Sequence, residues 1–376
     1  MRRADAGERE RLHGIFSELC RIESPFGHER ACADRVAGEL RALGLEVSED
    51  GAAGQAGAQC GNLLARIEGA ADASFVLCAH LDTVALAAPV EPVLVEGGWE
   101  NANDGVLGAD NKAAVAVLLE LARRCSIERP PIGIELLFTV SEENALAGAK
   151  AFDVGALRSD FGYVFDHASP IGEVVLSSPT YYRLGADFHG ASAHAGIRPE
   201  DGRSAIAAAA HAIAAMRLGR LDEETTANVS RIDGGGPSTN VVPERCRIEA
   251  EARSLDDAKV ESVVAELVDR VHDGANAAEC DVDVTVERLF LGYRTRPSAP
   301  QVGAAEAALR ACGYEPQRIV SGGASDANAF EAAGFACTNL ANGTERNHQP
   351  DERVSAAALE GMLDVAFALV STVAEC

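Results

Sequence analysis

Apolar residues recur at helical spacing in some stretches of the chain and as short β-branched runs in others, and the two kinds alternate. The helical stretches of the first half are 8–22, 29–43 and 111–124. The strand-like stretches are 61–68, 74–80, 133–140 and 162–165, and the small Gly/Ala-rich segment 51–59 is expected to be a loop. Such alternation predicts an α/β sheet with helices on both faces.

The pattern changes near residue 178. The next expected elements are strand 181–189, helix 203–218, strands 228–232 and 245–253, helix 255–272 and strand 281–289. This β-α-β-β-α-β order is the split βαβ pattern of a ferredoxin-like domain. The α/β pattern then returns with helices 300–312, 326–333 and 354–373 and strands 317–320 and 336–340. We therefore expect a discontinuous α/β domain, 1–177 with 294–376, and an inserted domain, 178–293.

Composition narrows the choice of partners and compartment. The 376 residues are 47% hydrophobic, enough for a full core, and the net charge of -25 argues against nucleic acid or an anionic membrane as the main partner. The charged N-terminus lacks a signal core, and we expect no apolar run of the ~18–20 residues that span a bilayer. Ten cysteines without a C-x-x-C pair indicate buried thiols of a reducing compartment, so the cytoplasm is the expected location.

Acids and histidines follow one expected strand after another. They are His80, Asp82, Asp110, Glu142, Glu143, Asp166 and His348. Two histidines and several carboxylates at strand ends suit a pair of divalent metal ions that activates water for hydrolysis. Asp82 is two residues beyond His80, on the same side of an extended chain, so it can accept the other ring N–H of that histidine. Glu142 and Glu143 should point opposite ways, one to metal and one to substrate as general base.

Each of these residues also has an ordinary structural interpretation. A lone histidine after a strand is more often structural, and Asp110 alone could be a helix N-cap. Cys78 could be a soft metal ligand, although a small core residue under a covering helix is the favoured interpretation. His167 is interpreted as structural. It is the joint occurrence of ligand-type residues at consecutive strand ends that predicts a di-metal site.

The order His, Asp, Glu, Asp, His, with His80-Leu-Asp82 and Glu142-Glu143, resembles the di-zinc exopeptidase and deacylase family that includes peptidase T, carboxypeptidase G and aminoacylase. The segment 108–113, Gly-Ala-Asp-Asn-Lys-Ala, resembles the peptidase T branch. The resemblance covers nearly the whole chain. It implies a metal-binding catalytic domain made of the two α/β segments and an inserted lid domain that also serves for dimerisation.

The resemblance also implies a role for each site residue. His80 and Asp166 would hold one metal ion, Glu143 and His348 the other, and Asp110 would bridge the two. Glu142 would be the general base and acid, and Asp82 would orient His80. The metals are expected to be zinc, with cobalt or manganese as alternatives. The peptide bond between Asp110 and Asn111 is expected to be cis.

Residues of the inserted domain and of a glycine-rich loop resemble substrate-binding positions of the family. His194, in Gly190-Ala-Ser-Ala-His194, would stabilise the oxyanion, in dimeric relatives across the subunit interface. Arg253 is expected to anchor the substrate carboxylate, because its fork suits a carboxylate. Asn240, Gly323 and Ser325 are expected to contact the substrate.

The sequence therefore predicts a di-metal hydrolase that cleaves amide bonds of small peptides. A tripeptide aminopeptidase or a dipeptidase is favoured because Asp, rather than Glu, stands at position 166. Two alternatives remain open: a deacylase of N-acyl amino acids, and a catalytically silent metal-binding homologue. The resemblance allows a homodimer formed through the lid, and we expect neither nucleic acid nor membrane as a partner.

Overall fold

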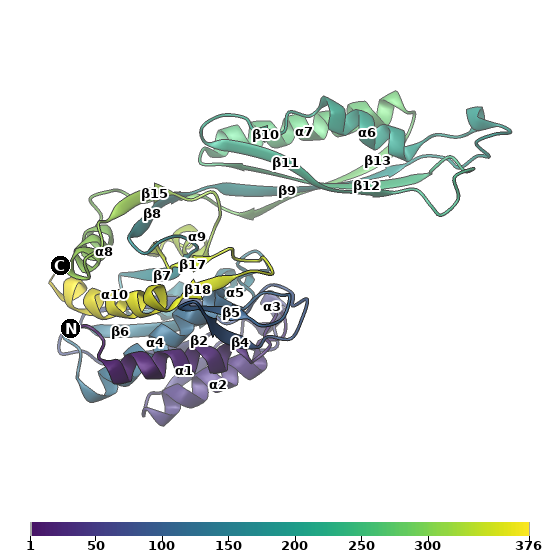
Figure 1. Ribbon diagram of the computed structural model, residues 1–376. Coiled ribbons are helices and arrows are strands. Elements are labelled where there is room, and N and C mark those ends of the chain that lie inside the picture. Colours follow the sequence, from purple (N-terminus) through teal and green to yellow (C-terminus); the bar gives the residue numbers. More distant parts are fainter. Residues whose placement is uncertain (1, 376) are drawn as a thin grey trace. The chain divides into compact units, whose positions relative to one another are not determined.

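The computed structural model describes residues 2–375, in which the chain forms two compact units. Unit 1 combines residues up to 177 with those from 294 onward, and unit 2 is Ser178–Tyr293. Figure 1 shows the helices and strands of both units.

Unit 1 contains most of the helices and a large mixed sheet. Its helices are α1 (Ala6–Cys20), α2 (Arg30–Ala42), α3 (Ala53–Ala56), α4 (Ala109–Ile127), α5 (Ala147–Ala151), η1 (Val154–Ala156), α8 (Pro300–Ala311), α9 (Asp326–Ala332) and α10 (Ala356–Ala374). The strands of the large sheet are β1 (Val47–Glu49), β2 (Leu63–Ile67), β3 (Ser74–His80), β6 (Gly133–Thr139), β7 (Phe161–His167), β8 (Glu173–Ser178), β14 (Tyr293–Arg294), β15 (Gln317–Val320) and β16 (Ala336–Ala341).

The centre of this sheet is parallel, which brings several strand ends to one edge. The strand order is β1-β2-β6-β3-β7-β16-β8, and β3 is parallel to β6 and β7, as β16 is to β7. Alternate residues of β3, such as Phe75 and Leu77, join the core cluster that includes α1, α4 and α10. Helix α9 packs on β7 and β16 and contacts α5. The predicted α/β sheet is confirmed, and the fully buried Cys78 is the core residue that was expected.

A second, smaller sheet of unit 1 was not predicted. It has the order β17-β18-β5-β4, with β4 (Pro92–Val95), β5 (Gly98–Asn101), β17 (Thr344–Glu345) and β18 (Arg353–Ser355). These strands have two to four residues, too few for an alternating pattern to stand out. Likewise, the segment 51–59 contains the short helix α3, where only a loop was expected. The small sheet matters because the chain between β17 and β18 carries His348.

Unit 2 confirms the ferredoxin-like prediction. Its elements are β9 (Thr180–His189), η2 (Pro199–Asp201), α6 (Ala205–Ala215), β10 (Gly219–Arg220), β11 (Thr225–Gly234), β12 (Arg245–Ser254), α7 (Asp257–Ala277) and β13 (Asp281–Phe290). The strand order is β10-β11-β12-β9-β13, with all neighbours antiparallel. Helices α6 and α7 cover one face, as Figure 1 shows, over buried residues such as Phe188 and Ile248. The opposite face is charged: Arg247, for example, is paired there with Asp187.

Helix α10 is long and rich in apolar residues. Its 19 residues have a mean hydropathy of 1.6 and are, by length and composition alone, apolar enough to cross a membrane. Glu360 and Asp364 interrupt it, so it is not the uninterrupted apolar run that the sequence analysis expected to be absent. In the structure 67% of the apolar window is buried, and α10 packs against α4 and α8 in the core of unit 1. This burial is the behaviour of a core helix.

A buried ion pair joins the helices beneath the parallel sheet. The Arg124 Nε of α4 donates to the Glu8 Oε1 of α1 at 2.7 Å, and both residues are at least 95% buried. The Arg124 guanidinium also lies 3.3 Å from the centroid of the Phe367 ring on α10. Removing one partner of such a pair leaves an uncompensated buried charge.

We therefore predict that Glu8→Gln lowers the free energy of unfolding of unit 1 by about 3–5 kcal/mol. The matched control is Glu18→Gln on the same helix, whose carboxylate is 55% exposed beside Arg35, and it should cost less than about 1 kcal/mol. Urea unfolding followed by the fluorescence of Trp99, the single tryptophan, reports on unit 1. Equal losses in the two variants would contradict the prediction.

Candidate metal and catalytic site

The parallel strands bring the predicted site residues to one edge of the sheet. His80 is the last residue of β3, Asp166 lies near the end of β7, and Glu142 and Glu143 follow β6 by a few residues. His80 and Thr139 are register partners across β3 and β6, so these two strands end at the same level of the sheet. Residues from distant parts of the sequence therefore meet because parallel strands run out at the same edge.

His80 lies at the centre of the first group. Its Nε2 is 3.2 Å from the Asp110 Oδ1 and 3.7 Å from the Asp166 Oδ1. Its Nδ1 donates to the backbone oxygen of Asp82 at 3.0 Å, so Nε2 is the nitrogen that faces the carboxylates. In a metal site this arrangement would present Nε2 as the ligand atom.

His348 brings in the second group. Its Nε2 lies 2.8 Å from the Glu143 Oε1 and 3.4 Å from the Asp110 Oδ2. Asp110 thus contacts both histidines, one with each carboxylate oxygen. The Asp110–Asn111 peptide bond is cis, as the resemblance implies.

Two sets of potential ligand atoms can be drawn from this cluster. In each set the atoms lie within 4.8 Å of one another: His80, Glu142 and Asp166 form one, and His80, Asp110 and Glu143 form the other. The five predicted metal ligands are therefore brought together. Glu142 comes as close as the ligands do, although its role was expected to be that of a base facing the substrate.

The cluster concentrates negative charge in a buried place. Burial, and then the charge of Asp110, raises the pKa of Asp166 well above its usual range. Burial, and then the charge of Asp166, does the same to the pKa of Glu142. The hydrogen bond to Asp110, and then that to Glu143, raises the pKa of His348 to about 10. These shifts share one cause, an excess of buried carboxylates, and a divalent cation would relieve it.

Asp82 does more than the sequence suggested. Its fully buried carboxylate accepts the backbone N–H groups of Glu142 and Glu143, each at 3.0 Å. Its Oδ1 is 3.5 Å from the His80 Nδ1, farther than the backbone oxygen that accepts from that nitrogen. The Asp82 carboxylate therefore lies against the His80 ring, as expected, and it also holds the segment that carries the two glutamates.

Further buried groups fix the same segment. The Ser141 hydroxyl donates to the Glu29 Oε1 at 3.0 Å, and the Asn62 Oδ1 accepts the Val140 N–H at 3.1 Å. Ser141 itself has φ 49°, in the left-handed region that non-glycine residues seldom adopt. Side chains from three separate parts of unit 1 thus determine where Glu142 and Glu143 stand.

Sequence reasoning missed Asn347 and Glu352 as members of the site. The Asn347 Nδ2 donates to the Asp110 Oδ2 at 2.8 Å. Glu352 is buried and accepts the Asp110 N–H at 2.9 Å; burial, and then the charge of Asp110, raises its pKa to about 7. A signal was available, since both residues lie within four positions of His348, but a polar loop after a histidine is not informative by itself.

The glycine-rich loop leads into helix α9. Ser325 is 99% buried and precedes α9, whereas Gly323 is half-buried and its N–H donates to the Ser321 Oγ at 3.0 Å. The buried Asp326 accepts a hydrogen bond from the Thr139 hydroxyl at 2.5 Å, next to His80 in the sheet. The substrate contacts expected of Gly323 and Ser325 stay predictions.

In unit 2 the predicted residues fall into two places. The exposed loops of His194 and Asn240 lie together, because the Ala195 N–H donates to the Asn240 oxygen at 2.9 Å. Arg253 lies at the other end of β12, where its guanidinium is 4.3 Å from the Tyr181 ring centroid and pairs with Glu251 at 3.1 Å. From Arg245, the end of β12 near the first two loops, to Arg253 the strand rises about 26 Å. One small substrate cannot contact both ends of the same unit.

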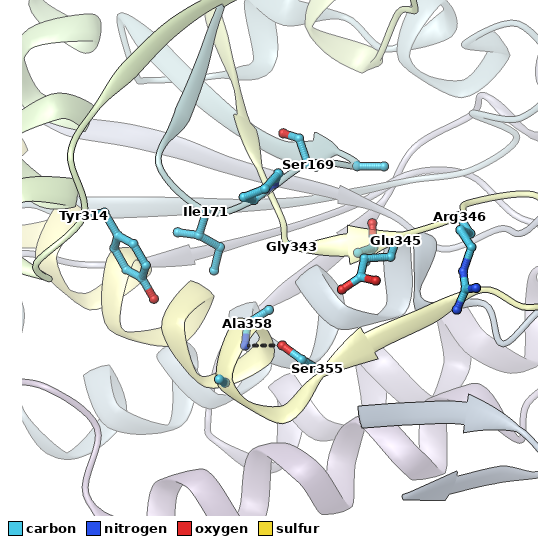
Figure 2. A pocket seen from close by; sticks show the side chains of 12 residues that line it. Ser169, Ile171, Tyr314, Gly343, Glu345, Arg346, Ser355 and Ala358 are labelled. Atoms are coloured by element: carbon cyan, nitrogen blue, oxygen red, sulfur yellow. Dashed lines mark hydrogen bonds between the residues drawn. The ribbon is translucent and has the colours of Figure 1, made fainter. Parts of the chain in front are cut away.

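A separate cavity of about 620 Å³ lies beside the end of β7, which carries Asp166, and beside β17, which precedes His348. Its wall is formed by residues 168–171, Tyr314, β17 and the first residues of α10. Figure 2 shows Tyr314 and Ile171 on one side and Glu345 and Arg346 on the other. The predicted metal ligands are not among the residues that line it.

Comparisons with known proteins agree with this architecture. Residues 180–279 match the model of the M20 peptidase dimerisation domain, and residues 62–167 match that of peptidase family M28. Protein YqjE of Bacillus subtilis strain 168 is 33% identical, over 97% of this chain and 99% of its own length.

Two solved structures are similar over almost their full lengths. Aminopeptidase PepT from Bacillus cereus ATCC 10987 is 35% identical, covers 97% of this chain and 99% of its own, and superposes with a TM-score of 0.86. A tripeptidase from Staphylococcus aureus subsp. aureus Mu50 is 32% identical, with coverages of 98% and 99% and a TM-score of 0.92. Identity at this level over nearly the whole chain establishes that the protein belongs to the peptidase T-like branch of the M20 metallopeptidase family.

Proposed function

We propose that this metallopeptidase removes residues from small peptides, as a tripeptide aminopeptidase or a dipeptidase, with two divalent metal ions at the sheet edge. The observation that carries the proposal is the convergence of two imidazoles and the carboxylates of Asp110, Glu142, Glu143 and Asp166. Similarity to an aminopeptidase and a tripeptidase supports the substrate class.

The donor set fits a pair of divalent ions. His80 with Asp166 would hold one ion, Glu143 with His348 the other, and Asp110 would be shared, since it already contacts both histidines. Nitrogen and carboxylate ligands of this kind suit zinc, and cobalt or manganese could replace it. When bound, such ions polarise a carbonyl and lower the pKa of water.

Glu142 is proposed to move the proton. It would accept a proton from the attacking water and pass it to the amine that leaves. Burial raises the pKa of Glu142 well above its usual value, and a carboxyl group with a raised pKa can both accept and return a proton near neutral pH. The two backbone N–H groups that Asp82 accepts keep this part of the chain in place.

The residues of unit 2 are proposed to bind the substrate's polar groups. The His194 Nδ1 accepts the Gly196 N–H at 3.2 Å, which leaves Nε2 as the ring nitrogen that can donate to an oxyanion. Arg253, held by Tyr181 and Glu251, is proposed to bind the substrate carboxylate. Because His194 and Arg253 lie at opposite ends of unit 2, we propose that His194 serves the site of a second copy of the chain, in a homodimer. The match of residues 180–279 to a dimerisation domain supports this.

Deacylation of N-acyl amino acids is the second candidate within the same chemistry. The fourth ligand position favours peptides, because Asp166 there is typical of the dipeptidase and tripeptidase members. A catalytically silent protein is disfavoured, since a copy without activity would not need Glu142 in addition to the five ligands.

The central test is turnover after metal reconstitution. We predict that the chelated protein is inactive and that zinc, cobalt or manganese restores hydrolysis of unblocked di- or tripeptides. N-acetyl amino acids assayed in parallel should react far more slowly. Faster turnover of the N-acetyl compounds would assign the protein to the deacylases, and inactivity on both classes with metal bound would refute the proposal.

For the base, we predict that Glu142→Ala lowers kcat by at least about 10²–10⁴-fold while metal affinity is retained. The matched variant is Glu143→Ala, which should lose metal affinity as well, because Glu143 is a proposed ligand. Calorimetric titration with zinc, beside steady-state assays, separates the two effects. If instead metal affinity fell only in Glu142→Ala, the roles of the two neighbours would have to be exchanged.

For the anchor, we predict that Arg253→Ala mainly raises KM. A substrate capped as a carboxamide should lose a similar free energy of binding in the wild type and little more in the variant, since partners in one contact are not additive. Arg247→Ala, six residues away on the same face of β12, is the control and should show additive effects. Additivity in Arg253→Ala would place the anchor elsewhere.

A further inference from the structure

The Glu352 carboxylate collects three backbone amides from one distant loop. Its Oε2 accepts the N–H groups of Leu107 and Gly108 at 2.9 and 2.8 Å, and its Oε1 accepts that of Asp110 at 2.9 Å. Glu352 is 98% buried, so these bonds are shielded from water. Charge-assisted bonds from a carboxylate to backbone N–H groups are among the stronger hydrogen bonds in proteins.

Glu352 belongs to the same turn as His348. Between β17 and β18 the Gln349 N–H donates to the Arg346 oxygen at 3.1 Å, and the Glu352 N–H donates to the Gln349 oxygen at 3.0 Å. His348 has φ 66°, so this turn is held in an unfavourable backbone conformation. The turn therefore brings His348 to the side chain of Asp110, while Glu352 binds the backbone of the loop that contains Asp110.

The loop before α4 also needs an external support. Gly108 has φ 76°, and Asp110 departs from helical geometry with ψ 104° although it lies in the first turn of α4. The N–H groups of this turn have no partner within the helix, as at any helix start. Glu352 supplies that partner from 242 to 245 positions away, and so it couples the loop to the His348 turn rather than capping it locally.

We propose that Glu352 is a positioning residue for metal binding, which sets Asp110 and His348 at the separation that a shared metal site requires. This inference rests on the proposed di-metal function. Asn347 acts in the same direction, since its side chain donates to the Asp110 Oδ2 at 2.8 Å from the same turn. Partners that orient metal ligands typically contribute 10–100-fold in metal affinity.

The test uses the full chain, stripped of metal, and measures zinc affinity by competition with a chromophoric chelator. Glu352→Gln keeps the size of the side chain but turns an amide group toward backbone N–H donors. It should weaken zinc binding by about 10–100-fold. Glu352→Asp keeps the charge with a shorter reach, and it should be intermediate. Glu345→Gln, an exposed carboxylate on β17 beside the same turn, is the matched control and should bind zinc as the wild type does.

Affinity is compared only for folded protein, as judged by far-UV circular dichroism and Trp99 fluorescence. A folded Glu352→Gln with wild-type affinity would overturn the inference and leave the proposed function intact. If Glu352→Gln does not fold, wild-type affinity in Glu352→Asp has the same meaning. A wild-type protein that binds no zinc, cobalt or manganese would instead remove the proposed function on which the inference rests.

Discussion

The structure of this site depends on holding several carboxylates together against their mutual repulsion. Asp110, Glu142, Glu143 and Asp166 converge at one buried sheet edge, and two histidines contribute the nearby positive charge. In water such groups would separate, and in a buried place each isolated charge is costly. The surrounding chain must therefore fix the carboxylates until a cation is bound.

Backbone amides provide much of that fixation. Asp82 accepts two N–H groups from the segment that carries Glu142 and Glu143, and Glu352 accepts three from the loop of Asp110. In both cases a carboxylate that is not itself a proposed metal ligand binds the backbone of the segment that carries the site carboxylates. The same loops contain residues in the left-handed region, such as Ser141 and His348, whose strain the surrounding contacts must offset.

Unit 2 imposes a different constraint, which is one of length. Strand β12 is long enough to separate Arg253 from the loops of His194 and Asn240 by about 26 Å. A polypeptide that uses both ends of such a unit on small substrates must present them to different sites. In the proposed function, two chains must therefore associate for His194 to reach a substrate. The face of the sheet that the helices leave uncovered carries ion pairs, which is compatible with its exposure to water.

The sequence by itself determined the class of fold and which histidines and carboxylates meet at the sheet edge. Hydrophobic periodicity marked the strands and helices of both units, and ligand-type residues at consecutive strand ends marked the chemistry, because parallel strands present their ends at a common edge. Only the tertiary structure decided how these residues are held. The small sheet that carries His348 has strands too short to be recognised in the sequence. The Asp82 carboxylate accepts the backbone N–H of Glu142, and Ser325 is buried, and neither fact is visible in the sequence. The role of Glu352 depends on contacts more than 240 positions apart, and such contacts leave no periodic pattern because they are set by packing rather than by local conformation.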